Sequence, residues 1–496
     1  MSTDPGFPAR HAAWTVLLLG LLVGLAFQGT RHLWEPDEGR YTDVAHEMVE
    51  LGDWLVPRLD PERPHFTKPP MTYWVIAASF SVFGNNEWAA RLPNALAFAF
   101  TALLVFGIAR RLRLENPLLA AGIWMTMWGP VMAANAVTTD TLLTLFETLA
   151  VFGFVASGLL DSGTTPRRPG LRLMWLGFGL AFLTKGPPGL LPLAAIVAFV
   201  AWRRWRCLFQ LLDLPGLVLF ATTGLSWYVV LIWRSPDLLD YFLVHETVGR
   251  AATGEHNRNA GWLGWLIVYP PTFLIGSLPW VALVGATWRS RRRHGETLAL
   301  DQDMQDFLWL WFAVPLAVFV LAQSRLPLYV LPLFVPLALM LAAWLGAWAR
   351  YGSRAAAAFA LALSVAIAVK GAGACWYPDQ DAYRLAAELR EQVDLSGIDE
   401  LVFVDIPARY GLKHYTGLSV EEAETHPGAV APEGYAPAEP LCHELATKER
   451  LLLIAPLRNA RDVEAHIERC PAQVERAGTL RRWVLLRRIP VAGAPA

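Results

Sequence analysis

Charged residues are scarce in this chain, where they make up 17% of 496 residues; soluble proteins carry about 25%. The basic residues sit in short clusters between apolar segments rather than on one face, which argues against a nucleic-acid-binding surface. Internal repeats and long low-complexity runs are both missing from the sequence. Only four cysteines are present and none has zinc-site spacing, so a structural zinc finger is not indicated.

Apolar residues are abundant instead, at 54% of the chain, and 22 residues are tryptophan, which favours membrane interfaces. The segment from Ala13 to Gly29 is almost wholly apolar and reaches the length of roughly 20 residues that crosses a bilayer. No small-residue cleavage site follows it, so we expect a retained span rather than a cleaved signal. The composition predicts a polytopic membrane protein with one appended soluble domain.

Basic clusters orient the predicted spans because Lys and Arg prefer cytoplasmic loops. With the N-terminus inside and Met71–Phe83 not crossing, every basic cluster lands in the cytoplasm. This counting predicts eleven spans, within a range of about 11–13. The segments are 13–29, 91–109, 117–134, 141–160, 171–184, 187–202, 215–233, 264–287, 306–322, 328–348 and 354–374.

The predicted fold is therefore a membrane all-α helical bundle with interfacial juxtamembrane helices and a small C-terminal α/β domain. Residues 1–375 form the transmembrane part, with an outer loop at 30–90, and residues 376–496 form a periplasmic domain. Strands are expected at 401–406, 451–455 and 482–486, helices at 383–392 and 461–469, and a loop at 421–440.

Two cysteines of this domain, Cys442 and Cys470, could pair in an oxidising periplasm. Spacing alone does not show that they do, and Cys375 is a competing partner. The sequence therefore leaves open whether these residues are bridged.

Polar residues collect in the predicted outer loops, which suggests a site at the outer face of the bundle. The most informative is the motif WEPDEGRY after the first span, which places Asp37 beside Glu38. The apolar positions that follow have helical spacing and predict a short helix lying flat on the membrane, with both acids at its start. Asp37 is then either a catalytic carboxylate or a helix N-cap, whereas Glu38 also suits the helix dipole.

A second motif, HFTKPPMTYW, places Lys68 before two prolines that can open a helix. A lysine beside a helix N-terminus can hold a lipid phosphate. The alternative is an interfacial lysine that extends to the headgroups.

The remaining candidates also have ordinary explanations. Asp140 could cap a helix, and Lys185 could bind headgroups or a donor phosphate. Arg325 and Tyr329 could contact the donor or anchor the chain at the interface. Possible ligands of a divalent metal are His245, Glu246 and His256, although lone histidines in a polar loop are usually surface groups.

An ordered series of motifs carries a resemblance to a known family. WEPDEGRY is followed by GDW at 52–54, TKPP at 67–70, NAVTTD ending at Asp140, LTKG at 183–186, GSLPW at 276–280 and RLPLY at 325–329. The series resembles the polyprenyl-phosphate-sugar-dependent membrane glycosyltransferases of the C-type superfamily. It is closest to the lipid A aminoarabinose transferases, and protein O-mannosyltransferases are more distantly similar. The likeness covers roughly residues 14–350.

The resemblance implies roles for individual residues. It makes Asp37 the catalytic carboxylate, Lys68 the cation at the donor phosphate and Asp140 the second outer-loop acid. Arg40 of the first motif is a further candidate for the donor phosphate. Aminoarabinose transferases have a glutamate that helps to hold a metal where this chain has Thr67, and the family's loop histidine is displaced, so the metal and the sugar both stay open.

The expected function is inverting transfer of a sugar from an undecaprenyl-phosphate donor to a periplasmic acceptor, at the inner membrane of a bacterium. The acceptor is expected to be lipid A or another cell-envelope glycolipid; protein O-glycosylation by the same chemistry is the alternative. Asp37 would act as base, and Lys68, with Arg325 or Lys185, would stabilise the departing phosphate. A lipid transporter or flippase is the alternative of another class. It should place ionisable residues near mid-membrane and show a repeat, and we expect neither.

Overall fold

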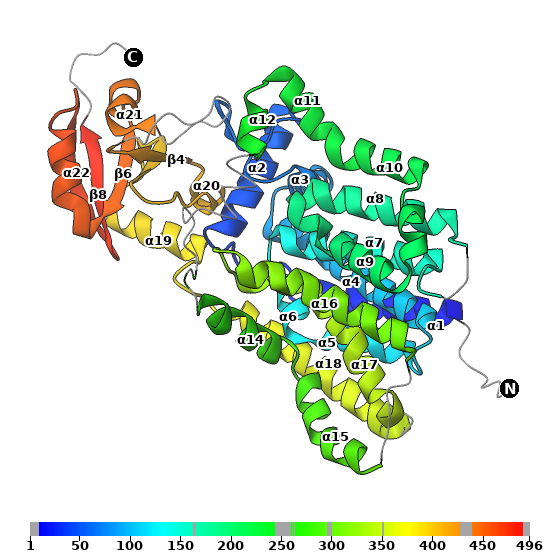
Figure 1. Ribbon diagram of the computed structural model, residues 1–496. Coiled ribbons are helices and arrows are strands. Elements are labelled where there is room, and N and C mark those ends of the chain that lie inside the picture. Colours follow the sequence, from blue (N-terminus) through cyan, green and yellow to red (C-terminus); the bar gives the residue numbers. More distant parts are fainter. Residues whose placement is uncertain are drawn as a thin grey trace. The chain divides into compact units, whose positions relative to one another are not determined.

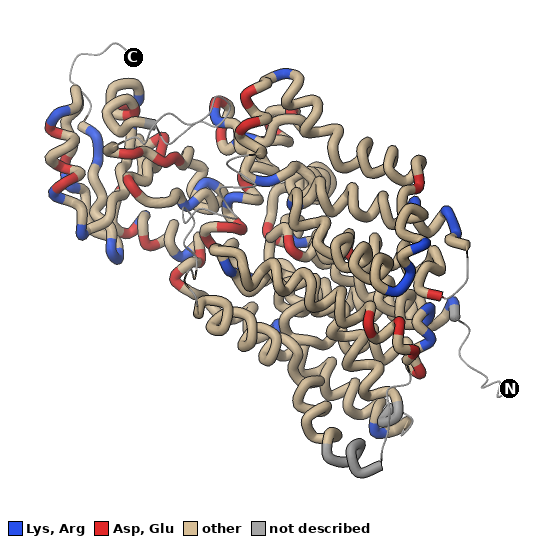
Figure 2. Tube along the Cα trace, viewed as in Figure 1, with Lys and Arg blue, Asp and Glu red and all other residues tan. Residues whose placement is uncertain are grey.

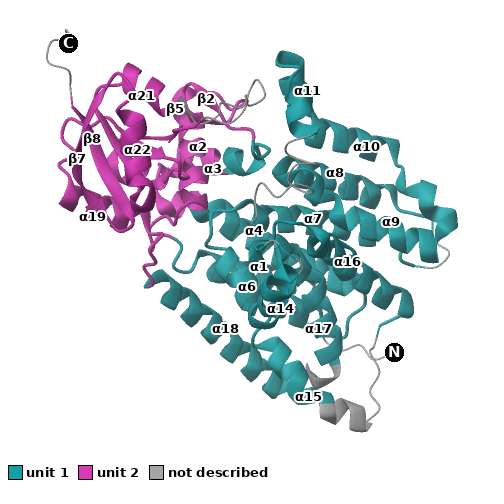
Figure 3. Ribbon diagram, turned by 60° about the vertical axis from the view of Figure 1, so that its left-hand side comes forward, with its two compact units in different colours: residues 1–28, 67–75, 91–375 teal, residues 29–66, 76–90, 376–496 magenta. Residues whose placement is uncertain are grey.

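The computed structural model describes residues 9–161, 165–243, 259, 261, 263–294, 300–349, 352–426 and 439–489. The chain forms two compact units, shown in Figure 3. Unit 1 comprises residues 1–28, 67–75 and 91–375, and unit 2 comprises residues 29–66, 76–90 and 376–496. The chain passes from unit 1 to unit 2 for the last time between Cys375 and Trp376. Most of the first outer loop therefore groups with the C-terminal region, whereas its residues 67–75 group with unit 1.

Helices make up almost all of the described part of unit 1 (Figure 1). The helices from the N-terminus to residue 203, of which α2 belongs to unit 2 and α3 and α4 to both units, are α1 (Ala9–Leu25), α2 (Asp37–Leu51), α3 (Met71–Phe83), α4 (Glu87–Arg111), α5 (Pro117–Thr126), α6 (Trp128–Ala133), α7 (Thr139–Ser157), α8 (Arg168–Lys185), η1 (Pro187–Leu190) and α9 (Leu191–Arg203). Those that follow are η2 (Trp205–Leu211), α10 (Leu214–Phe220), η3 (Ala221–Leu225), α11 (Ser226–Arg234), α12 (Leu238–Asp240), α14 (Gly264–Gly276), α15 (Trp280–His294), α16 (Gln302–Leu321), η6 (Pro327–Leu333), α17 (Phe334–Ala349) and α18 (Gly352–Ala374).

Each of the predicted spans coincides with a helix or with neighbouring helices. Among the described residues, six helices are long and apolar enough to cross a membrane, or up to seven if the bent pair 264–276 and 280–288 is one span. Four shorter apolar helices, including Met71–Phe83, accompany them. Figure 2 shows long uncharged stretches along the helices of unit 1, with charged residues gathered near helix ends. The predicted membrane helical bundle is confirmed.

The expectation that no ionisable residue lies near the middle of a span was wrong for Glu147, which is buried at the middle of α7. Lys370 is also buried, near the C-terminal end of α18. The ammonium of Lys370 donates hydrogen bonds to the carbonyl oxygens of Val23 and Gly24 near the end of α1. A cation is favourable there because the last carbonyls of a helix lack partners within it.

Unit 2 contains the predicted C-terminal α/β domain. Its mixed six-stranded sheet has the order β5-β4-β3-β6-β8-β7, in which β3 pairs in parallel with β4 and β6, and β8 runs antiparallel to β6 and β7. The strands are β3 (Glu400–Val404), β4 (Ser419–Glu424), β5 (Glu439–Pro440), β6 (Leu451–Pro456), β7 (Gln473–Leu480) and β8 (Trp483–Ile489). The helices are α19 (Ala382–Gln392), α20 (Gly411–Thr416), α21 (Leu441–Thr447), η7 (Leu457–Asn459) and α22 (Ala460–Ile467).

Alternate residues of the central strands face opposite sides of this sheet, and each side is covered by helices. Leu401 and Phe403 pack with α19 and α20, whereas Val402 and Val404 pack with α21 and α22. Both faces are buried, which explains why the central strands read as short continuous apolar runs. The predicted loop at 421–440 was wrong at its two ends, because β4 extends to Glu424 and β5 begins at Glu439; residues 427–438 lie outside the described part.

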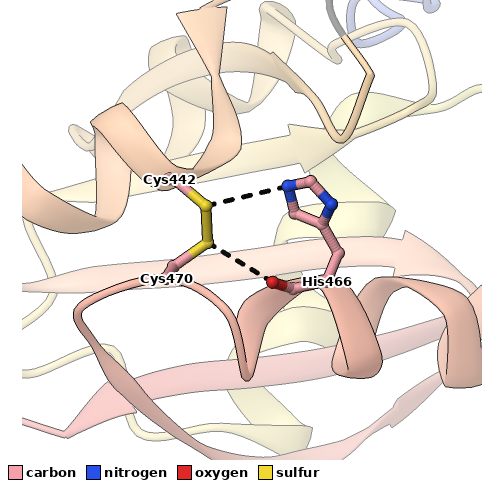
Figure 4. Close-up of a disulfide and its surroundings, with 3 residues drawn as sticks. All are labelled: Cys442, His466 and Cys470. Atoms are coloured by element: carbon pink, nitrogen blue, oxygen red, sulfur yellow. Dashed lines mark hydrogen bonds between the residues drawn. A yellow bond between two sulfur atoms is a disulfide. The ribbon is translucent and has the colours of Figure 1, made fainter.

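A disulfide joins Cys442 and Cys470, as Figure 4 shows, and links α21 to the turn after α22. Cys207 and Cys375 are free, so the competing pairing with Cys375 was wrong. The side chain of His466 lies beside the bridge, with its Nε2 atom 3.7 Å from the sulfur of Cys442.

Candidate functional site

Asp37 begins helix α2 in unit 2, and its side chain remains partly exposed. Pro36 precedes the helix and occupies the N-cap position, so the N-cap interpretation of Asp37 was wrong. Instead the Oδ1 atom of Asp37 accepts a hydrogen bond from the guanidinium of Arg40, at 2.7 Å, and its side chain is 41% exposed. An exposed carboxylate with a fixed cation beside it is oriented and still accessible to a reactant. The predicted short helix with acids at its start is confirmed.

Glu38 is the next residue, but its carboxylate is buried and has different hydrogen-bond partners. Its two carboxylate oxygens accept hydrogen bonds from Arg31, at 2.6 and 2.7 Å, and one of them also accepts from the backbone N–H of Trp34. The guanidinium of Arg31 stacks over the Trp34 ring, 3.9 Å from its centroid. Such a bidentate, buried pair is strong and rigid. A catalytic role for Glu38 stays a prediction, and these contacts favour a role in shaping the turn that presents Asp37.

Glu35 and Gly39 of the WEPDEGRY motif also stabilise this turn. Glu35 is buried, and its Oε1 atom accepts a hydrogen bond from the backbone N–H of Gly411, at 2.5 Å. Burial raises the pKa of the Glu35 carboxyl to about 8, although Arg409 and the Gly411 N–H act in the opposite direction. Gly39 lies against both groups, and a Cβ atom there would sit 2.6 Å from Oε1 of Glu35. The close approach therefore requires glycine at this position.

A second polar group lies in unit 1, where α7 begins and α8 ends. The ammonium of Lys185 lies 2.5 Å from Oδ1 of Asp140, and both side chains are nearly buried. The Tyr329 ring covers the same ammonium at 4.3 Å from its centroid, a distance typical of a cation–π contact. Thr138 is the N-cap residue of α7, so the capping interpretation of Asp140 was also wrong. The structure thus brings together three of the predicted residues.

The packing of α7 against α8 explains why Asp140 and Lys185 lie in contact. Helices α7 and α8 run antiparallel, and Gly177 of α8 lies so close to α7 that a Cβ atom would be 2.5 Å from the backbone nitrogen of Ala150. Small residues allow helices in membranes to approach closely. The start of α7 is held from α4, because the Asn94 amide donates to the carbonyl oxygens of Ala136 and Thr138, at 2.5 and 3.1 Å.

Lys68 and Arg325 also belong to unit 1. Two prolines precede α3 as expected, and Lys68 is half-buried just before them, with its ammonium donating to the carbonyl oxygen of Thr67 at 2.9 Å. Arg325 is buried, and its guanidinium donates to the carbonyl oxygens of Asn259, Gly261 and Val320. Arg325 thus holds three backbone segments together by hydrogen bonds. Contact between Arg325 and a sugar donor stays a prediction.

The metal candidates His245, Glu246 and His256 lie outside the described residues. Within the described part, two groups could hold an ion by proximity. The first comprises Cys442, His466 and Cys470, but its two cysteines form a disulfide and so offer no thiolate to a metal. The second comprises Glu400, Glu421 and Glu444, and it already contains two cations, Arg63 and Lys448. The sequence leaves the metal open, and the described residues do not test its three candidate ligands.

Sequence reasoning missed two charged residues. Glu147 lies two turns after Asp140 on α7, is buried, and interacts electrostatically with Lys185. A carboxylate inside an apolar span was the available signal, because such residues are usually functional. Lys413 of α20 contacts Asp43 and Glu47 of α2, and no local pattern indicated it.

Known proteins resemble this chain in both sequence and fold. The family described as dolichyl-phosphate-mannose-protein mannosyltransferase matches residues 67–233. The undecaprenyl phosphate-α-4-amino-4-deoxy-L-arabinose arabinosyl transferase of Edwardsiella ictaluri is 34% identical over 66% of this chain and 58% of its own length. The corresponding transferase of Pseudomonas aeruginosa is 31% identical over 70% of this chain and 62% of its own length. The aligned part of this chain thus spans about three fifths of these relatives.

The crystal structure of ArnT from Cupriavidus metallidurans bound to undecaprenyl phosphate has the same fold. It superposes with a TM-score of 0.73 at 19% identity, covering 98% of this chain and 100% of that one. The chain is therefore similar in sequence to undecaprenyl-phosphate aminoarabinose transferases over about two thirds of its length, and it shares the fold of ArnT over nearly all of it.

Proposed function

We propose that this protein transfers a sugar from an undecaprenyl-phosphate donor to an acceptor at the periplasmic face of a bacterial inner membrane. The observation that carries the proposal is the joint likeness to one kind of transferase, over about two thirds of the chain in sequence and nearly all of it in fold. Lipid A or another cell-envelope glycolipid is the first candidate acceptor. A protein acceptor is the second candidate, because the matching family is described as a protein mannosyltransferase.

The chemistry follows from the donor. The acceptor hydroxyl oxygen attacks the anomeric carbon, and the bond from that carbon to the phosphate oxygen breaks. Polyprenyl phosphate leaves with the electron pair, and the proton of the hydroxyl goes to the carboxylate of Asp37. In-line displacement of this kind inverts the anomeric centre. A positioned base contributes about 10²–10⁴-fold to such a step.

The cations are assigned to the phosphate. Lys68 precedes the N-terminus of α3, where backbone N–H groups favour an anion, and Lys185 is the cation of the buried pair with Asp140. Tyr329 keeps the Lys185 ammonium in place by covering it. Arg40 orients Asp37 through their hydrogen bond, and we assign its positive charge to the departing phosphate as well.

The outward orientation supports a lipid-linked donor. Asp140 and Lys185 lie at one end of α7 and α8, whereas Arg167, Arg168 and Arg172 lie at the other. Basic residues prefer the cytoplasm, so the end with the ion pair faces outward. Nucleotide sugars stay in the cytoplasm, which leaves a polyprenyl-phosphate sugar as the donor.

The test is transfer by purified protein in lipid, with labelled polyprenyl-phosphate pentoses and hexoses and a panel of acceptors that includes lipid A and protein. We expect release of polyprenyl phosphate together with a labelled product. Lys68→Ala should lower the rate and the apparent donor affinity together, and Lys68→Arg should recover part because the charge is kept. Arg450→Ala, which removes an exposed surface cation in unit 2, is the matched control.

Two outcomes would contradict the proposal. No release from any donor by the wild-type protein would oppose transfer chemistry. Movement of intact lipid between leaflets in the same vesicles would support a flippase, an alternative that the buried Glu147 and Lys370 keep open.

A further inference from the structure

Helix α2, whose first residue is Asp37, packs against α20 of the C-terminal domain through one cation. The ammonium of Lys413 lies 3.2 Å from Oδ1 of Asp43 and 2.5 Å from Oε1 of Glu47. The two acids are four residues apart, so they share one face of α2. Both are buried, at 5% and 7% exposure. All three residues belong to unit 2.

The electrostatics of this cluster depend on the lysine. Burial raises the pKa of the Asp43 carboxyl to about 7, and Lys413 acts against that rise. Burial would lower the pKa of the Lys413 ammonium, but Asp43 and Glu47 raise it above its usual value. Removing the cation would leave two buried acids facing each other on one helix, and that arrangement is strongly unfavourable.

The residues before α2 are tied to the same domain. The backbone N–H of Glu35 donates to the carbonyl oxygen of Gln380, at 2.8 Å, and that of Ala382 donates to the carbonyl oxygen of Leu33, at 3.0 Å. The Glu35 side chain accepts from the backbone of Gly411 at the start of α20. The turn that presents Asp37 is therefore fixed from the C-terminal domain and not only by its own contacts.

The residues after α2 also contact the C-terminal domain. The strands β1 (Arg58–Asp60) and β2 (Arg63–Pro64) form a small hairpin. The Arg63 guanidinium pairs with Asp60 of the hairpin and reaches Glu421 and Glu444 of the C-terminal domain. Lys448 lies among the same carboxylates and reduces their repulsion.

We infer that the C-terminal domain positions the helix that carries Asp37, and that Lys413 is the principal positioning residue. This inference rests on the proposed function. Lys413 acts through Asp43 and Glu47, which lie about two and about three turns along α2 from its first residue. Loosening this contact lets the first turn of α2 drift, and a misplacement of about 1 Å at a reacting group can cost about 10²-fold in rate.

The first experiment measures kcat and the donor KM of purified full-length protein in lipid. Lys413→Met should lower kcat about tenfold or more while the donor KM changes less than about twofold. Lys413→Arg should recover most of the loss, because the cation is kept between the two acids. The charge exchange Lys413→Glu with Glu47→Lys should recover part. Arg450→Met removes an exposed cation of the same domain and should behave as wild type.

A purely structural role predicts a different pattern, in which the amount of folded protein falls and each folded molecule keeps its normal kcat. That pattern, or unchanged kinetics in Lys413→Met, would overturn the inference. If Lys413→Met does not fold, Glu47→Gln keeps the pair with Asp43 and should lower kcat by a smaller factor. A normal kcat in Glu47→Gln would then count against the inference.

Hydrogen exchange separates this inference from the proposed function. In Lys413→Met, the amides of α2 should exchange at least about tenfold faster than in wild type, and those of α22, on the opposite face of the sheet, should not. The Arg450→Met control should leave both unchanged. A wild-type protein without transfer activity would refute the proposed function alone, whereas unchanged exchange in α2 would refute the positioning role alone.

Discussion

The guanidinium of Arg40 binds Oδ1 of Asp37 at 2.7 Å, one turn along the same helix. The pair therefore orients the carboxylate from within α2 and leaves its side chain 41% exposed. Glu38, the neighbouring acid, is enclosed by Arg31 and Trp34 instead. Two adjacent carboxylates thus have different surroundings, and of the two only the Asp37 side chain is accessible to solvent to a large extent.

Asp37→Asn should abolish most transfer activity and leave the fold intact. The amide keeps the size of the side chain and can still accept from Arg40, but it cannot take the proton of an acceptor hydroxyl. We expect a loss of about 10²–10⁴-fold in kcat. Transfer of label to the acceptor measures it, with the melting temperature as the check on folding. Near-normal transfer would remove Asp37 from the role of base.

Gly177→Val should separate α7 from α8 and disturb the pair of Asp140 and Lys185. A side chain at this position meets the backbone of Ala150, so the helices cannot keep their distance. We expect a lower melting temperature and at least about tenfold lower transfer, since buried overpacking costs about 1–3 kcal/mol. The control is Gly285→Val in α15, where a Cβ atom would meet nothing within 4 Å. Equal effects of the two variants would contradict the packing argument.

The stability of unit 2 should fall as the pH rises from about 4.5 to 8. The native Glu35 carboxyl keeps its proton up to a pKa of about 8, whereas the unfolded one releases it near 4.5. Protonation of Glu35 therefore stabilises the folded state fully below about pH 4.5, and this stabilisation is lost as the pH rises to about 8. Asp43 acts in the same direction up to about 7.

Glu35→Gln provides the test, because glutamine resembles the neutral carboxyl. Between pH 5 and 8.5 its melting temperature should fall less than that of wild type. Glu50→Gln, at an exposed position of α2, is the control and should follow the wild-type profile. The pH-dependent stabilisation attributed to Glu35 would be refuted by a Glu35→Gln profile identical to wild type.

Thiol labelling of the unreduced, denatured protein should modify Cys207 and Cys375 but neither Cys442 nor Cys470. Cys375 is exposed and serves as the positive control in the native protein. Reduction should destabilise the C-terminal domain by about 3 kcal/mol, because the bridge constrains the unfolded chain. Modification of both bridged positions without reductant would show that the disulfide does not form in the expressed protein.

Reporter fusions test the orientation. Fusions after Arg113 and Arg206 should report the cytoplasm, and fusions near Asp140 and Gln380 should report the periplasm, because basic loops stay inside. The two sets control each other within one protein. A cytoplasmic report near Gln380 would place the C-terminal domain on the wrong side for the proposed reaction.

The sequence by itself determined which segments are helices of the membrane bundle, where the α/β domain lies and that α2 begins with the acidic pair. These features are local: long apolar runs, basic clusters and short branched strands each leave a periodic or compositional signal. Even the bridge between Cys442 and Cys470 was among the few possible pairings of four cysteines.

Only the tertiary structure decided which charges meet. Asp140 and Lys185 are 45 residues apart, and Lys413 and Glu47 are 366 apart. No local pattern marks such partners, since each charge alone also suits a cap, a headgroup or water. Burial decides between these roles, because a charge removed from water needs an opposite charge or hydrogen-bonding groups, and packing determines which of them are within reach.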